Sequence, residues 1–240
     1  MNPEIRTSAV AVLFLFLGAG WRALAGGEPG GGLKANLDLP FDAAGESDGD
    51  EEDAPEIVIF WGQRYEGDGI FFCCDKSDSM SGAPMERLRK EMIESLRQLS
   101  ERAQFGIVLF DSRVYQFPAT GRPATATAQM KAAGESWIRS VSPGSCSCYK
   151  EGLLTALNFA LQSTVRRKLI IVLGDGHVFC PGVDRNTYAR ETLRAVAERN
   201  CQAIQINTIC LGSPGRVNEE WMRELAEQNG GRYTRIYTSN

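Results

Sequence analysis

Short apolar runs alternate with amphipathic stretches through the chain after residue 56. The runs at 70–74 and 169–173 are apolar on both faces, which is typical of strands buried inside a parallel sheet. Apolar residues then recur every three or four positions from Met85 to Leu99, which predicts an amphipathic helix that starts at Pro84. Further strands are expected at 57–60, 105–110, 114–117, 204–211 and 232–237, and further helices around 130–137, 153–161, 193–197 and 218–229.

This alternation predicts an α/β fold with a mostly parallel central sheet and helices on both faces. The segment 114–117 follows 105–110 across a short turn, so we expect it to pair as one antiparallel edge strand. In such folds, ligands bind beyond the carboxyl ends of the parallel strands. The residues that follow 70–74 and 169–173 are therefore the first candidates for a functional site.

The first 55 residues differ from the rest of the chain. An apolar core at 9–17 and the small-x-small sequence Ala23-Leu24-Ala25 predict a secretory signal peptide over 1–25, cleaved after Ala25, with a retained membrane anchor as the alternative. Residues 26–55 are rich in Gly and in acidic side chains, and six carboxylates fall between 46 and 53, which predicts a disordered linker. We expect residues 56–240 to form one exported domain, periplasmic, on the cell surface or secreted.

Composition removes several functions. The formal net charge of the 240 residues is −4, which argues against nucleic acid as a partner. His177 is the only histidine, so a multi-histidine metal site is excluded. The Gly-x-Ser-x-Gly sequence at 45–49 lies in the acidic segment and not between a predicted strand and a predicted helix, which argues against a serine hydrolase of that kind.

Three polar clusters are expected at the strand ends. Asp75, Ser77 and Ser79 offer three oxygens at alternate positions of a first loop, and Asp175 follows 169–173. The sequence Ser145-Cys146-Ser147-Cys148 supplies hydroxyls in a second loop. Two carboxylates with several hydroxyls suit a hard divalent ion such as Mg²⁺, with Mn²⁺ or Ca²⁺ as alternatives. Because hydroxyls are weak ligands, the ion would keep enough Lewis acidity to bind a carboxylate from another molecule.

The motif Asp75-x-Ser77-x-Ser79 resembles the metal-ion-dependent adhesion site of von Willebrand factor type A domains. That family has a Rossmann-like fold, and it also uses a Thr from a second loop and an Asp from a third. Gly174-Asp175-Gly176 is similar to the third loop, and the resemblance extends over 56–240. It implies a non-enzymatic module that binds the Glu or Asp of a partner protein through its ion. The implied metal ligands are Asp75, Ser77, Ser79, Ser147 and Asp175.

Two positions depart from the family pattern. The second-loop Thr is absent, and counting back six residues from Leu153 places Ser147 at its position, with Ser145 as the alternative. Asp78 stands where the family often has Gly, and we expect its side chain to face solvent. Both departures keep oxygen ligands in the loops, so the resemblance to a metal site survives them.

The seven cysteines divide into core and loop positions. Cys73, Cys74 and Cys210 lie in apolar runs, and we expect them to be buried thiols. In an oxidising compartment, Cys180 is expected to pair with Cys146 or Cys148 and so to join the second loop to the third. A zinc site made of these three thiolates and the single histidine is the rival interpretation.

Two other functions compete with metal-dependent binding. The first is a scaffold of the same fold that self-associates without a metal. The second is a phosphatase of the haloacid-dehalogenase type, whose nucleophilic Asp would be Asp75; its general acid would be a second Asp two residues on, where this chain has Ser77. Contact with a membrane is expected only if the N-terminal segment is retained.

Overall fold

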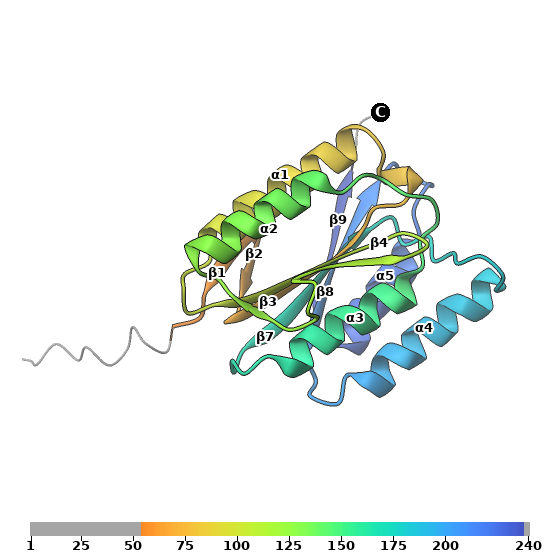
Figure 1. The fold of residues 1–240 in the computed structure, drawn as a ribbon. Helices are drawn as coiled ribbons and strands as arrows, with labels where there is room; N and C mark the ends of the chain where they lie inside the picture. The colour runs from red at the N-terminus through yellow and green to blue at the C-terminus, as the bar shows by residue number, and fades with distance from the viewer. Residues whose placement is uncertain (1–53, 238–240) are drawn as a thin grey trace, which may run out of the picture. The chain divides into compact units, whose positions relative to one another are not determined.

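The computed structural model describes residues 54–237, which form a twisted sheet between two layers of helices (Figure 1). The strand order is β5-β4-β3-β7-β8-β9, and β6 (Ala124–Thr125) pairs with β4 off this path. β5 (Val114–Phe117) and β6 run antiparallel to β4, and the expected α/β class with an antiparallel edge strand is confirmed. The parallel strands are β3 (Gly69–Asp75), β4 (Gln104–Phe110), β7 (Lys168–Gly174), β8 (Gln205–Gly212) and β9 (Tyr233–Tyr237).

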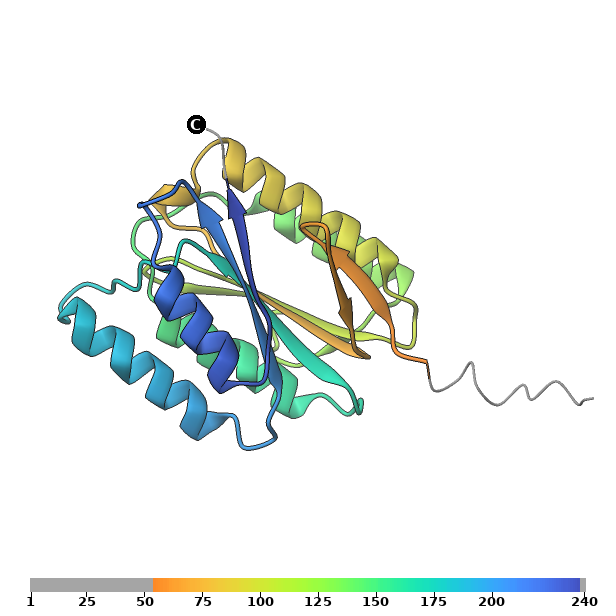
Figure 2. The same cartoon turned by 180° about the vertical axis from the view of Figure 1, so that it is seen from behind.

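Helices cover both faces of this sheet. Helices α1 and α2 lie on one face, and α3, α4 and α5 lie on the other (Figures 1 and 2). A separate antiparallel hairpin, β1–β2, packs beside α1. The bounds are α1 (Ala83–Gln98), α2 (Ala128–Ser140), α3 (Tyr149–Gln162), α4 (Arg185–Arg199), α5 (Glu219–Gln228), β1 (Ile57–Phe60) and β2 (Gln63–Glu66).

Alternation of side chains along β3 builds the two hydrophobic cores. Phe72 and Cys74 point into the core under α1 and α2, whereas Phe71 and Cys73 point into the core under α3. All seven residues of β3 are buried, as the continuous apolar run predicted. On the α3 side, a Cβ at Gly106 would lie 2.8 Å from the Phe159 ring, so only glycine lets α3 pack this closely on β4.

The sequence pattern missed the hairpin but placed the helix around 130–137 correctly. β2 occupies part of the segment between the predicted strands at 57–60 and 70–74, and of its residues only Tyr65 is buried, so it lacks an apolar pattern. Trp61 and Gly62 have φ of 52° and 69°, which suits a two-residue hairpin turn. In α2, Gly134 and Ile138 are buried, and Met130 and Trp137 are partly buried against the same core.

No helix within residues 54–237 is long and apolar enough to cross a membrane. Residues 1–53 lie outside the described part of the chain, and they include the predicted signal peptide and most of the predicted linker. Both of those assignments therefore stay predictions.

Candidate metal centre

The two aspartates of the predicted site lie at the ends of neighbouring strands: Asp75 is the last residue of β3, and Asp175 follows β7. β3 pairs with β7 in parallel, with Cys74 opposite Leu173, so Asp75 and Asp175 meet at the same edge of the sheet. Asp75 is fully buried, and Asp175 is 7% exposed. The carboxylate of Asp175 is close enough to raise the pKa of Asp75. The structure thus brings together two acids from segments a hundred residues apart in sequence.

Of the two aspartates, Asp75 is the more deeply buried, and one of its carboxylate oxygens has no hydrogen-bond partner among the described residues. Its Oδ1 accepts a hydrogen bond from the Ser77 main-chain N–H at 2.7 Å, but its buried Oδ2 has no hydrogen-bond partner among the described residues. Burial, followed by the neighbouring Asp175, raises the pKa of Asp75 to about 7, although the Ser77 N–H and the nearby hydroxyls of Ser77 and Ser147 pull it down. A buried carboxylate oxygen without a partner is costly, and a cation would offset that cost.

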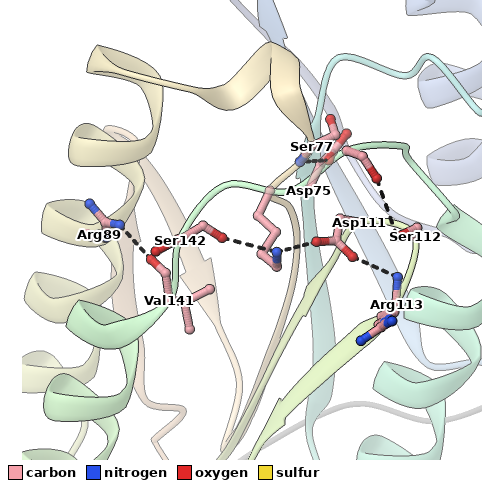
Figure 3. Close-up of polar contacts among 10 residues, drawn as sticks. Asp75, Ser77, Arg89, Asp111, Ser112, Arg113, Val141 and Ser142 are labelled. Atoms are coloured by element: carbon pink, nitrogen blue, oxygen red, sulfur yellow. Dashed lines mark hydrogen bonds and ion pairs between the residues drawn. The ribbon is translucent and has the colours of Figure 1, made fainter.

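The first loop presents its hydroxyls next to Asp75. The Ser77 and Ser79 Oγ atoms lie 3.1 Å apart, and Asp75 and Ser77 face each other in Figure 3. Ser77 is buried, whereas Ser79 and Asp78 are exposed at the short 3₁₀ helix that follows. The expectation that Asp78 faces solvent is confirmed, and Ser79 marks the open side of the cluster.

The second loop brings Ser147, and not Ser145, to the aspartates. Ser147 is 6% exposed, and its hydroxyl lies near Asp75. Two main-chain hydrogen bonds with Phe179, at 3.0 and 3.2 Å, fix this position against the loop after β7. Ser145 is exposed instead; its hydroxyl approaches Ser112 at 3.4 Å.

A buried ion pair that sequence reasoning missed supports both loops. The Lys76 ammonium bonds to the Asp111 carboxylate and donates to the Ser142 carbonyl at 3.1 Å (Figure 3). The ammonium also lies 4.2 Å from the centre of the Tyr115 ring, and this cation–π contact further stabilises its positive charge. The Asp111 carbonyl accepts from the Cys148 N–H at 3.0 Å, so this pair links the end of β4 to both candidate loops.

The buried Tyr149 hydroxyl lies beneath the two aspartates, next to Gly174 and Gly176. Its hydroxyl accepts a hydrogen bond from the Gly176 N–H at 3.0 Å, and it would be 2.0 Å from a Cβ at Gly174. Burial, together with the charges of Asp75 and Asp175, raises the pKa of Tyr149 well above its usual range. The Gly-Asp-Gly sequence therefore has a packing reason, because glycine at 174 makes room for this hydroxyl.

A disulfide between Cys148 and Cys180 joins the second loop to the third. This confirms one of the two expected pairings and leaves Cys146 as a half-buried free thiol. The zinc interpretation is wrong for this structure, because two of its three proposed thiolates are bonded to each other. The core thiols are buried as expected: Cys73, Cys74 and Cys210.

Gly144→Ala tests the packing of the second loop on the ion pair. A Cβ at Gly144 would lie 1.7 Å from Asp111 Oδ2, and Lys76 holds that carboxylate in place. We expect a loss of about 2 kcal/mol in the free energy of unfolding, measured with denaturant. Gly134→Ala in α2 is the control: its nearest neighbours are side-chain atoms at 3.3 Å, and its change should stay within about 0.5 kcal/mol. Equal losses in the two variants would contradict the assignment.

Known proteins share this architecture. A family model described as the von Willebrand factor type A domain matches residues 69–235. The chain belongs to the von Willebrand factor type A (vWA) family. Domains of this family are generally interaction modules and not enzymes, so the haloacid-dehalogenase interpretation has no support from the family.

Two curated relatives extend the vWA match. The chain is 27% identical over 175 residues to inter-alpha-trypsin inhibitor heavy chain H4 of Homo sapiens, covering 70% of this chain and 18% of that protein. It is 31% identical over 176 residues to the corresponding heavy chain 4 of Mus musculus, with the same coverages of 70% and 18%. The chain therefore spans less than a fifth of the length of these relatives.

Solved vWA structures share the fold at low identity. A von Willebrand factor type A structure from Catenulispora acidiphila superposes with a TM-score of 0.59 at 17% identity, covering 72% of this chain and 40% of that one. The vWF domain of the type V pili tip protein Mfa5 from Porphyromonas gingivalis superposes with a TM-score of 0.54 at 13% identity, covering 70% and 89%. These likenesses agree with the fold described above.

Proposed function

We propose that this vWA domain is an exported, metal-dependent protein-binding module. The observation that carries the proposal is the pair of buried or nearly buried carboxylates, Asp75 and Asp175, with Asp75 Oδ2 lacking any hydrogen-bond partner in the described part of the chain. Folding has concentrated negative charge at the carboxyl end of the sheet without placing a cationic side chain against that oxygen. A divalent cation, Mg²⁺ or else Mn²⁺ or Ca²⁺, fits this donor set of carboxylates and hydroxyls.

The roles of the residues follow from their placement. Ser77, Ser79 and Ser147 offer neutral hydroxyl oxygens, and the two aspartates supply the negative charge, directly or through bound water. When present, the ion supplies a Lewis-acidic position that a Glu or Asp carboxylate of a partner protein can bind. Ser79 and Asp78 are exposed, so the partner has access from this side. The buried Lys76–Asp111 pair positions the loops and has no role in binding the partner's carboxylate.

The setting of the protein also supports binding to another protein outside the cell. The disulfide Cys148–Cys180 is of the kind that persists in oxidising compartments, and residues 1–25 carry the features of a secretory signal. The name of Mfa5 places that vWA domain in a pilus tip protein, and we carry this over as a proposal of an adhesive or assembly role. The acidic residues 46–53 would then be a spacer ahead of the domain.

Ser147→Ala with Ser145→Ala as its matched control tests the metal site. Calorimetric titration of chelator-stripped protein with Mg²⁺ should show a single saturable site, and Ser147→Ala should weaken it by about tenfold or more, the loss expected when one charge-assisted bond worth about 1.5–3 kcal/mol is removed. Ser145→Ala should leave the affinity unchanged, because its hydroxyl faces Ser112 and solvent. Unchanged affinity in both variants, or absence of binding to the wild type, would favour a metal-independent scaffold.

A further inference from the structure

Three cysteines surround Ser147, and only two of them are bonded. Cys148 is joined to Cys180, whereas Cys146 is a free, half-buried thiol on the other side of Ser147. The proposed function uses Ser147 and leaves this arrangement of sulfur atoms unexplained. A free thiol that shares a loop with a disulfide raises the question of which pairings the loop permits.

The backbone places a second partner opposite Cys180. Ser147 and Phe179 form an antiparallel bridge with hydrogen bonds in both directions, at 3.0 and 3.2 Å. The bridge is isolated; in a regular antiparallel pair, the residue before one member lies opposite the residue after the other, so continuing this register by one residue would place Cys146 opposite Cys180. Cys148 reaches Cys180 instead because the chain bends there: its φ and ψ are −80° and 76°, and the two Cα atoms are 4.7 Å apart.

We propose that Cys146, Cys148 and Cys180 form a thiol–disulfide exchange site that controls the position of Ser147. The Cys146 thiolate attacks Cys180 Sγ, and the Cys146–Cys180 bond forms as the Cys148–Cys180 bond breaks. The electron pair leaves on Cys148, which takes up the proton that Cys146 lost. The step is an isomerisation, so it consumes neither oxidant nor reductant.

Two features around Cys148 set the balance between the pairings. Cys148 is the N-cap residue of α3, where the helix dipole favours negative charge and so favours Cys148 as the leaving group. The Glu151 carboxylate acts in the opposite sense, since its oxygen lies within 4.8 Å of both bonded sulfur atoms and repels a thiolate there. Glu151 is held by the Tyr188 hydroxyl, which donates to it. The acid therefore favours the Cys148–Cys180 pairing.

The exchange would couple to the metal site, and this part of the inference rests on the proposed function. In the Cys148–Cys180 form, the Ser147 hydroxyl lies near Asp75. Pairing through Cys146 transfers the tether to the other neighbour of Ser147 and frees Cys148 at the start of α3. An ion that binds Ser147 in one form must, by linkage, raise the population of that form.

Trapping the disulfides tests the exchange directly. The full chain carrying Cys201→Ser, which removes an exposed thiol and so limits exchange between molecules, is incubated at pH 8 with chelator or with Mg²⁺. Acid quenching, alkylation and peptide mapping then give the two pairings. We expect Cys146–Cys180 peptides in chelator and a shift of at least about fivefold toward Cys148–Cys180 in Mg²⁺. Absence of any Cys146–Cys180 peptide in both conditions would overturn the exchange.

Three variants keep the test decisive. Cys148→Ser should form Cys146–Cys180 on oxidation, and a folded variant that keeps both thiols free would overturn the proposal. Glu151→Gln, with Cys148 in place, should raise the Cys146–Cys180 fraction in chelator, whereas Cys146→Ser should show only the original pairing. If Mg²⁺ fails to bind the wild type, the proposed function fails while these peptides still support the exchange. If Mg²⁺ binds but the ratio of the two disulfide pairings is the same in chelator and in Mg²⁺, the proposed coupling to Ser147 is wrong.

Discussion

Asp75→Asn should stabilise the metal-free protein at pH 8 and abolish its response to Mg²⁺. Asp75 is fully buried, and burial together with Asp175 raises its pKa from 3.8 to about 7. Folding without a cation therefore forces an unfavourable carboxylate into the site at pH 8. Asparagine keeps the shape of the side chain but carries no charge, so it removes this cost together with the main acidic ligand.

The pH dependence of this effect has a defined sign. The pKa of Asp75 is higher in the folded state, so its contribution to stability is fully present below about pH 3.8 and is lost as the pH rises through about 7. A difference of about three pKa units corresponds to on the order of 4 kcal/mol. In chelator, the gain from Asp75→Asn should thus be large at pH 8 and small at pH 4.

Denaturant unfolding at pH 4 and pH 8, with chelator or with excess Mg²⁺, measures both parts of this prediction. Mg²⁺ should stabilise the wild type at pH 8 and leave Asp75→Asn unchanged. Asp78→Asn is the matched control, because Asp78 is exposed in the same loop and should respond to Mg²⁺ as the wild type does. An Asp75→Asn protein that is less stable than the wild type in chelator at pH 8 would show that the carboxylate is well compensated without a cation.

Lys76→Met should be the most destabilising single substitution near the site. The Lys76 and Asp111 side chains are 3% and 6% exposed, so removing the ammonium leaves a buried carboxylate without its cation. Breaking such a pair costs about 3–5 kcal/mol in the free energy of unfolding. Because the pair links the end of β4 to both candidate loops, weaker binding of Mg²⁺ should accompany the loss.

Two comparisons separate this effect from a general loss of charge. Arg97→Met removes one partner of an ion pair with Glu135, at 2.7 Å, in which the arginine is 59% exposed, and it should cost less than about 1 kcal/mol. Adding Asp111→Asn to Lys76→Met removes the stranded charge and should recover much of the stability. Similar losses for Lys76→Met and Arg97→Met, measured by denaturant unfolding, would contradict the role given to the buried pair.

The sequence predicted the strands and helices whose apolar residues follow a simple pattern. Continuous apolar runs identified β3 and β7, and the positions of Asp75 and Asp175 after them followed from the rule that ligands bind at strand ends. The five predicted ligands do lie at the carboxyl end of the parallel strands or on the loops there. That they hold an ion stays a prediction. Family resemblance, and not periodicity, singled out Ser147 over Ser145.

What the sequence missed depends on contacts between distant segments. Lys76 lies inside the recognised motif, but its partner Asp111 follows a different strand, β4, and only the pairing of β3 with β4 brings the two together. β2 has one buried residue, too few to produce an apolar pattern. The choice between Cys146 and Cys148 depended on the bend at Cys148, which residue types alone do not reveal.

A crystal of the protein soaked in Mn²⁺ tests the central claim most directly, because anomalous scattering locates the ion without assumptions about its ligands. The account predicts one strong peak among Asp75, Ser77, Ser79, Ser147 and Asp175, at about 2.0–2.6 Å from the oxygens that bind it. The peak should disappear in Asp75→Asn and persist in Asp78→Asn. A well-occupied peak elsewhere, or no peak in a crystal that leaves this edge of the sheet open to solvent, would contradict the account.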